Sequence, residues 1–135
     1  MNASTRQERL ELLALLEERE RRQKRRKLFT YFPDEGPLRR ELYQQHLEFF
    51  RLGAKVPTRC FMAANRVGKT EGGGGYETTL HLTGRYPSWW EGHRFSHPID
   101  AWAAGDTNET VRDIIQDKLV GPESAYGTGL IPAED

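Results

Sequence analysis

Residues 63–70 have the residue types and spacing to hold the phosphates of a nucleotide. The stretch runs Ala63-Ala-Asn-Arg-Val-Gly-Lys-Thr70, so that a glycine, a lysine and a threonine close it. In phosphate-binding loops the glycine lets the backbone approach the phosphates, the lysine reaches the β- and γ-phosphates, and the threonine hydroxyl binds Mg²⁺. Backbone N–H groups of the loop and of the following helix complete an anion site. We therefore predict that Lys69 binds phosphate and is catalytic, and that Thr70 is a magnesium ligand.

Ala63 stands where this pattern usually begins with glycine. The position starts the turn, and alanine fits there if its φ is negative, whereas a positive φ would be strained. A charged surface turn is the alternative interpretation of the same residues. We expect the loop to bind ATP with Mg²⁺, and the residues expected to line the site are Ala63, Ala64, Asn65, Arg66, Val67, Gly68, Lys69 and Thr70.

The elements that must position such a loop are a buried strand before it and a helix after it. Residues 58–64 are mostly apolar and predict the strand, and a helix can follow the loop to about residue 82. Residues 100–105 predict a second buried strand. Asp106, with Glu109, predicts the cap of a helix that runs to residue 119. The predicted fold class is α/β with parallel strands.

The N-terminal part predicts two further helices. Residues 5–8 (Thr-Arg-Gln-Glu) resemble a capping box that opens a long helix, in which Leu10, Leu13 and Leu16 are helically spaced. Its basic end, residues 21–27, is either a solvated helix end or a surface for DNA or another partner. A second helix is predicted from Pro37 to Gly53. The expected domains are a charged helical arm, residues 1–30, and a nucleotide-binding domain, residues 31–135.

Composition excludes several function classes. The 135 residues contain 20 basic and 20 acidic side chains, so overall charge does not argue for nucleic acid or membrane. A single cysteine, Cys60, excludes an internal disulfide, and no apolar run is long enough to span a membrane. Together with the lack of a signal peptide, these features predict a soluble cytoplasmic protein.

Several other residues are predicted to have structural roles. Cys60, inside the first strand, is expected to be buried, and the tryptophans Trp89, Trp90 and Trp102 are expected to pack rather than stack on bases. A metal site at His81, His93 and His97 is not expected. The chain has one cysteine, so no second thiolate could join these histidines, and no predicted helix would present them on one face. Residues 72–75 are four glycines, which cost about 3 to 4 kcal/mol of helix propensity relative to alanine.

The loop lies within a longer pattern. Upstream are Tyr31-Phe-Pro-Asp, Arg40-Glu-Leu-Tyr43 and Glu48-Phe-Phe50; downstream are Leu80-His-Leu-Thr-Gly84, Tyr86-Pro, Trp89-Trp-Glu-Gly92 and Ala101-Trp-Ala-Ala-Gly-Asp106. From about Tyr31 to Pro122 the chain resembles the large terminase subunit of tailed bacteriophages. The tryptophan-rich segment behind the loop is more particular to that family than the loop itself.

The resemblance implies an ATPase that packages DNA into capsids, with a RecA-like N-terminal domain and a C-terminal metal-dependent nuclease. It implies Lys69 on the phosphates, Thr70 on Mg²⁺, and Arg66 either as a catalytic charge-stabilising trigger or as a solvent-facing side chain. It also implies an adenine-reading residue near Gln44, Gln45 and His46. Expected partners of the intact motor are double-stranded DNA, the small terminase subunit, the portal protein and further copies of the chain, in the host cytoplasm.

The chain is expected to be a truncated N-terminal piece of such a subunit, because only two strands are legible and the later catalytic carboxylates and the nuclease are not seen. Asp106 is assigned a capping role instead of magnesium binding. Two alternatives remain. One is another small phosphate-loop enzyme such as a kinase, and the other is a non-catalytic module that binds a nucleotide or a partner.

Overall fold

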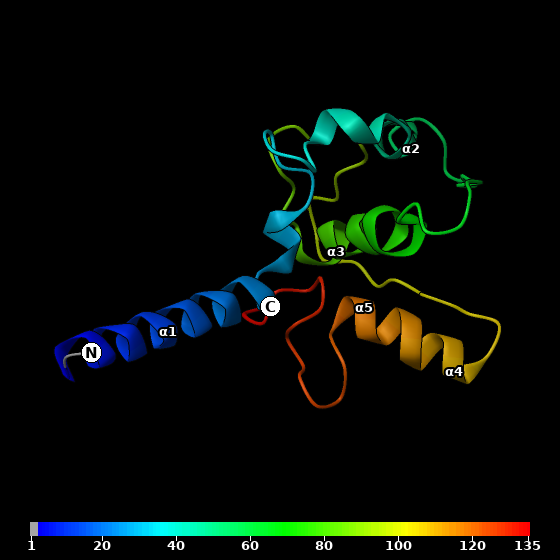
Figure 1. Cartoon of the computed structure of the whole chain (residues 1–135). Helices are drawn as coiled ribbons and strands as arrows, with labels where there is room; N and C mark the ends of the chain where they lie inside the picture. The colour runs from blue at the N-terminus through cyan, green and yellow to red at the C-terminus, as the bar shows by residue number, and fades with distance from the viewer. Residues whose placement is uncertain (1–2) are drawn as a thin grey trace.

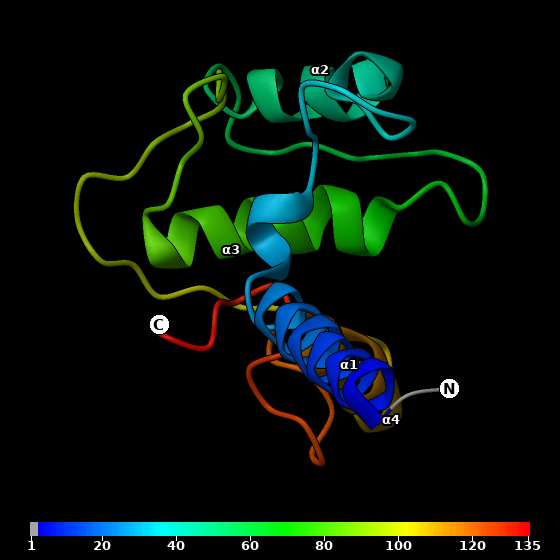
Figure 2. The same cartoon turned by 60° about the vertical axis from the view of Figure 1, so that its left-hand side comes forward.

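The computed structural model describes residues 3–135, which form helices joined by long irregular segments (Figures 1 and 2). In chain order the elements are α1 (Ala3–Lys24), the 3₁₀ turns η1 (Lys27–Thr30) and η2 (Arg40–Tyr43), α2 (Gln44–Leu52), the π-helix η3 (Lys69–Gly75), α3 (Tyr76–Thr83), α4 (Asn108–Thr110), the π-helix η4 (Val111–Gln116) and α5 (Asp117–Leu119). Because η3 continues into α3, and α4 continues through η4 into α5, these form two longer helices, 69–83 and 108–119.

The predicted α/β fold with parallel strands is wrong, because residues 3–135 contain no strand. Both expected strands, 58–64 and 100–105, are irregular, and the helix formed by η3 and α3 lies between them. On one side the Phe61 ring would lie 3.2 Å from a Cβ on Gly73. On the other side Ala103 lines a cavity between this helix and α5. Paired strands lie about 4.8 Å apart, so a helix about 10 Å wide prevents the ladder.

The core is a cluster of aromatic side chains between α2 and α3. Phe32 lies at its centre with a φ of 52°, and its ring makes edge contacts with Phe50 and Tyr76 at 5.7 and 5.0 Å between ring centroids. Trp90 is buried and Trp89 packs against the cluster, which confirms their predicted packing role. Trp102 is 98% exposed, so the packing prediction is wrong there. The buried members are Leu28, Phe32, Phe50, Tyr76, Leu80 and Trp90.

The second predicted helix begins later than Pro37. Residues 33–39 are irregular, and regular structure starts with η2 at Arg40. Among the apolar residues of this predicted helix, Phe50 is buried and Leu47 packs on the core, whereas Leu38 and Leu42 are exposed. The helical end at Gly53 is as predicted, since α2 ends at Leu52.

The glycine run lies in η3 and at its junction with α3, and packing explains two of its four members. A Cβ on Gly73 would crowd Phe61, as described above. A Cβ on Gly75 would lie 2.8 Å from the carbonyl oxygen of Thr70 and 3.0 Å from the Leu130 side chain. At Gly72 and Gly74 a Cβ would make only ordinary contacts, at 3.7 Å or more, and we have no physical account of glycine there.

The helix at 108–119 ends where the sequence predicts but is capped differently. Thr107, and not Asp106, is the N-cap, because its hydroxyl oxygen accepts a hydrogen bond from the Thr110 N–H at 3.1 Å. Asp106 is exposed one residue earlier. Threonine and aspartate both cap helices well, so the residue type alone could not fix the boundary.

The arm and the C-terminal segment meet at the base of the molecule. Figure 1 shows α1 projecting away from the other helices, with the C-terminus near the end of α1 that joins the body. The segment after α5 folds back: the Leu130 N–H donates to the Lys118 carbonyl at 2.8 Å, and Leu130 is fully buried. Arg85 then binds Asp135 through two hydrogen bonds.

Candidate functional site

The loop at 63–70 is a tight turn that leads directly into η3. The Lys69 ammonium bends back over it and donates hydrogen bonds to the carbonyl oxygens of Ala63 and Ala64, the second at 2.9 Å. Gly68 has a φ of 80°, a left-handed conformation that favours glycine. Outside glycine, positive φ occurs among the described residues at Phe32 and Arg66, so Ala63 meets the condition under which alanine is tolerated.

The loop presents backbone donors. Among the described residues, no acceptor is recorded for the N–H groups of residues 65–68, and η3 begins immediately behind them. Free N–H groups that precede a helix form a concave anion site, to which the helix dipole adds. The positive end of the helix and the Lys69 ammonium therefore both lie at this loop.

A cavity of about 470 Å³ opens beside the loop. Its walls come from the segment after η1, from α2 and from the loop, and they are largely aromatic. This mixture of apolar walls with a few polar groups is typical of small-molecule sites. The lining residues are Thr30, Tyr31, Phe32, Pro33, Leu38, Tyr43, His46, Arg66, Val67, Gly68, Glu71 and Gly72.

His46 is the one of the three adenine-reading candidates that lines this cavity. Its side chain is 6% exposed and its ring stacks edge-on against Phe61 at 5.0 Å. Burial lowers the pKa of His46, while backbone groups of the loop at Gly68 and Val67 oppose that shift. Gln44 and Gln45 are exposed, and the Gln44 amide donates instead to the carbonyl of Glu41.

Arg66 and Thr70 face different cavities. Arg66 is exposed and lines the cavity with His46. Thr70 is also exposed, but it lines a cavity of about 210 Å³ between η3, Ala103 and α5. Arg66 and Gly68 thus line the cavity that contains His46, whereas Thr70 lines the cavity toward α5. The Lys69 ammonium is bound to the carbonyls of Ala63 and Ala64. Asn65 lies in the exposed turn of the loop.

Glu71 is a site residue that the sequence analysis missed. Its carboxylate accepts a hydrogen bond from the Tyr31 hydroxyl and forms ion pairs with Lys27 and Lys118, the latter at 2.8 Å. Burial alone would raise the pKa of this carboxyl, but these hydrogen bonds outweigh burial and hold the pKa at about 2. The only sequence signal was an acidic residue directly after Thr70.

The pKa of Tyr31 shifts in the opposite direction, upward from its ordinary value. Burial, and then its hydrogen bond to the Glu71 carboxylate, raise the pKa of the Tyr31 phenol. The hydroxyl therefore stays protonated and remains a donor at neutral pH. This fixes the tyrosine ring at the edge of the cavity beside the loop.

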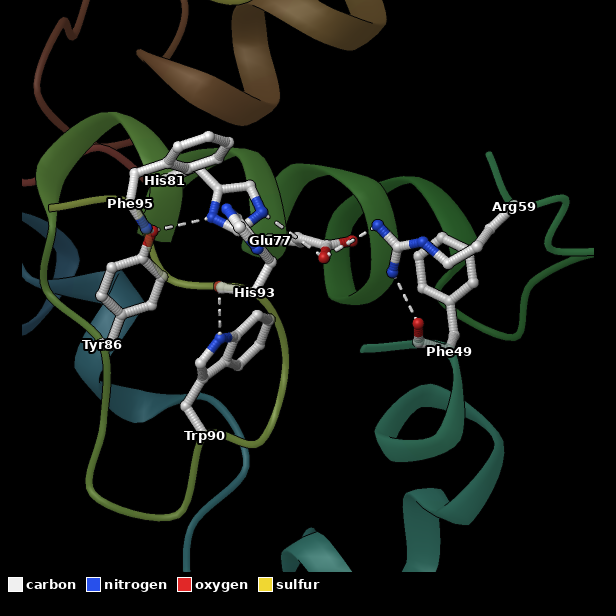
Figure 3. A network of polar contacts seen from close by, with 8 residues as sticks. All are labelled: Phe49, Arg59, Glu77, His81, Tyr86, Trp90, His93 and Phe95. Carbon is white, nitrogen blue, oxygen red and sulfur yellow. Dashed lines mark hydrogen bonds and ion pairs between the residues drawn. The ribbon is translucent and has the colours of Figure 1, made fainter. Parts of the chain in front are cut away.

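A buried chain of polar contacts positions α3 behind the loop (Figure 3). Glu77, 5% exposed, binds Arg59 at 3.0 Å and approaches His81 Nε2 at 3.5 Å. The other ring nitrogen of His81 lies 2.9 Å from the Tyr86 hydroxyl, which accepts a hydrogen bond from the Phe95 N–H at 3.0 Å. Figure 3 shows that these groups link the segment before the loop, α3 and the tryptophan-containing segment.

Four of the six basic side chains at the end of the arm form ion pairs, with three carboxylates between them. Arg21 and Arg22 bind Glu18, and Arg26 lies 3.5 Å from Glu134. Lys27 binds Glu71, as described above. A basic side chain that is already paired with a carboxylate neutralises a DNA phosphate less well, and so releases fewer of the counterions condensed on DNA, than an unpaired one.

The remaining candidate residues form no metal site in the described part of the chain, where no group of three or more potential ligands occurs. Cys60 is exposed, so its predicted burial is wrong, because the strand expected to bury it does not form. No helix within residues 3–135 is long and apolar enough to cross a membrane.

Comparison with known proteins gives one relevant relationship. No family model and no solved structure matches the chain. The chain is 38% identical, over 144 aligned residues, to a protein of Salmonella phage P22 described as "Terminase, large subunit". The alignment covers 96% of this chain and 27% of the relative. The resemblance that the sequence indicated is thereby confirmed: the chain is similar to this terminase large subunit over nearly its whole length and spans about a quarter of it.

Proposed function

We propose that this chain is the ATP-binding portion of a viral DNA-packaging motor of the terminase large-subunit type. The observation that carries the proposal is the loop at 63–70, with free N–H groups and the Lys69 ammonium, directly beside a cavity with aromatic walls. The relationship to a terminase large subunit agrees with it. In the intact motor the partners would be double-stranded DNA, the small terminase subunit, the portal protein and other copies of the subunit, in the host cytoplasm.

In this proposal the loop binds the phosphates and the cavity beside it takes the base. Lys69 exchanges its bonds to the carbonyls of Ala63 and Ala64 for the more strongly charged phosphate oxygens. His46, buried at the back of the cavity, contacts the adenine. Arg66 lies on the rim and is placed to approach the charge that develops on the transferred phosphoryl group.

The donor chemistry is compatible with magnesium. Mg²⁺ in nucleotide sites takes one or two protein oxygens and otherwise phosphate oxygens and water. The exposed hydroxyl of Thr70, directly after Lys69, could supply one such oxygen if its side chain turned from the cavity between η3 and α5 toward the loop. When bound, the ion would neutralise charge on the β- and γ-phosphates.

ATP hydrolysis would need a carboxylate that activates water, and none within residues 63–71 is available for it. Glu71 is held by two lysines and a tyrosine. We therefore propose nucleotide binding by this chain and hydrolysis coupled to DNA movement only in the intact motor. A non-catalytic nucleotide-binding role, the second candidate, is favoured by the same observation.

Calorimetry with ATP and Mg²⁺ tests the proposal, with Lys69→Ala as the loop variant and the exposed Lys55→Ala as the matched control. Loss of a charge-assisted contact worth about 1.5 to 3 kcal/mol predicts binding roughly 10 to 150 times weaker for Lys69→Ala. Lys55→Ala should bind like the parent. Equal affinities of both variants, or no binding by the folded parent, would exclude this site.

A further inference from the structure

The arm carries a helix face with an unusual arrangement of charges. With 3.6 residues per turn, positions 6, 9, 10, 13, 16, 17 and 20 of α1 fall within an arc of about 120°. The side chains on this face are Arg6, Arg9, Leu10, Leu13, Leu16, Glu17 and Glu20. Two arginines, three leucines and two glutamates thus follow in order, and the pattern is symmetric about Leu13 except that the charges change sign.

The leucines of this face have nothing packed on them. Leu10, Leu13 and Leu16 are 59%, 47% and 45% exposed. The C-terminal segment meets the arm just after α1, where the Ala133 N–H donates to the Arg25 carbonyl. Figure 1 shows the N-terminal part of the helix standing clear of the other elements.

The charges of this face also have no recorded partner among the described residues. No ion pair or hydrogen bond to another described residue is recorded for the side chains of Arg6, Arg9, Glu17 or Glu20. Within one helix each pair brings like charges three residues apart, which is unfavourable. The two arginines also lie near the positive end of the helix dipole. An isolated helix is therefore electrostatically strained by the same charges.

We propose that α1 is a self-association surface that pairs with α1 of a second copy in antiparallel orientation. Such pairing places Leu13 on Leu13, Leu10 on Leu16, Arg9 opposite Glu17 and Arg6 opposite Glu20. Both ends gain the same contacts, as a two-fold interface requires. A parallel pair would instead place Arg9 against Arg9 and Glu17 against Glu17, so the charge pattern selects the antiparallel dimer.

The geometry leaves room for this arrangement. A helix of 22 residues is about 33 Å long, and Leu13 lies about 18 Å from the arm's junction with the body at Arg25. An antiparallel pair centred on Leu13 therefore keeps the two bodies at opposite ends. Leu15 lies on the other side of the helix, where it lines a cavity with Arg19 and Phe29, and takes no part. The inference does not depend on nucleotide binding.

Sedimentation equilibrium on the full 135-residue chain tests the proposal through charge exchange. The double variant Arg6→Glu/Arg9→Glu makes the face acidic at both ends, and Glu17→Arg/Glu20→Arg makes it basic at both ends. We expect the parent to dimerise, each variant alone to be monomeric at the same concentration, and an equimolar mixture to form a heterodimer. Variants that dimerise alone like the parent, or a parent that stays monomeric at about 100 µM, would overturn the proposal.

Two further measurements separate contact from misfolding and fix the orientation. Leu13→Ala should weaken the dimer at least tenfold, whereas Leu15→Ala, with the same change in helix propensity, should leave it unchanged. In a Cys60→Ser background, an oxidised mixture of Leu10→Cys and Leu16→Cys chains should give mainly the mixed disulfide. Predominantly like-with-like disulfides would indicate a parallel pair and would reject the antiparallel arrangement.

Discussion

Glu71 Oε2 lies 2.8 Å from Lys118 Nζ, and this ion pair joins the start of the helix behind the phosphate-type loop to α5. The other carboxylate oxygen of Glu71 binds Lys27 at the end of the arm. A single carboxylate thus connects three segments that are distant in sequence. Glu71 directly follows Thr70, the proposed magnesium ligand. The Glu71 carboxylate therefore contributes both to the stability of the chain and to the geometry of the candidate site.

Acid should destabilise the chain through Glu71. Burial raises the pKa of this carboxyl, but its hydrogen bonds lower the pKa by more, so that the pKa is about 2 instead of 4.5. Because the folded value is the lower one, the contribution to the free energy of unfolding is complete above about pH 4.5 and disappears as the pH falls toward 2.

The variant Glu71→Gln should lose about 1 to 2 kcal/mol of stability near neutral pH, since partial solvent exposure screens the ion pairs. The loss should be smaller near pH 3, where the parent has already lost part of this contribution. Urea unfolding at both pH values measures it, with the exposed Glu109→Gln as control. The same loss at both pH values would show that the carboxylate charge is not the cause.

The glycine run should divide into positions that need glycine and positions that do not. Gly74→Ala should stabilise by about 0.4 to 1 kcal/mol, because alanine restricts the unfolded chain and no close contact awaits its Cβ. Gly75→Ala should lower the melting temperature, because its Cβ would lie 2.8 Å from the Thr70 carbonyl oxygen. Thermal denaturation compares the two, and stabilisation by both would mean that η3 is not packed as described.

The cavity should be selective for the base through His46. His46→Gln should weaken ATP binding about tenfold, equivalent to about 1.4 kcal/mol, and leave the affinity for inorganic tripolyphosphate unchanged. Gln45→Ala, on the exposed face of α2, should alter neither. Competition titrations with a fluorescent ATP analogue measure both ligands. A parallel loss for ATP and tripolyphosphate would place His46 in a phosphate-binding or purely structural role.

The chain by itself should bind ATP without turning it over at a meaningful rate. Hydrolysis needs a positioned base as well as a phosphate site, and the nearest carboxylate, Glu71, is engaged by lysines. A steady-state phosphate-release assay with Lys69→Ala as the contamination control measures this. Turnover that depends on Lys69 would mean that a carboxylate outside the loop, such as Asp106, acts as the base.

The amino-acid sequence determined the features that local chemistry controls. The position of the turn at 63–70 follows from residue types at fixed spacing, and the helix ends near Gly53, residue 82 and residue 119 follow from glycine and apolar periodicity. The packing of Trp89 and Trp90 was also predictable, because large aromatic side chains gain most from burial. The relationship to terminase large subunits was visible in the motifs alone.

Only the tertiary structure decided what depends on partners distant in sequence. Residues 58–64 and 100–105 have the composition of strands, but a strand exists only when a neighbour completes its hydrogen bonds, and here a helix lies between the two segments. Cys60 and Trp102 are exposed for that reason. The roles of Glu71 and His46 likewise required the fold, since their partners come from η1, α5 and the loop. Local patterns specify conformations, whereas long-range contacts decide which of them can be satisfied together.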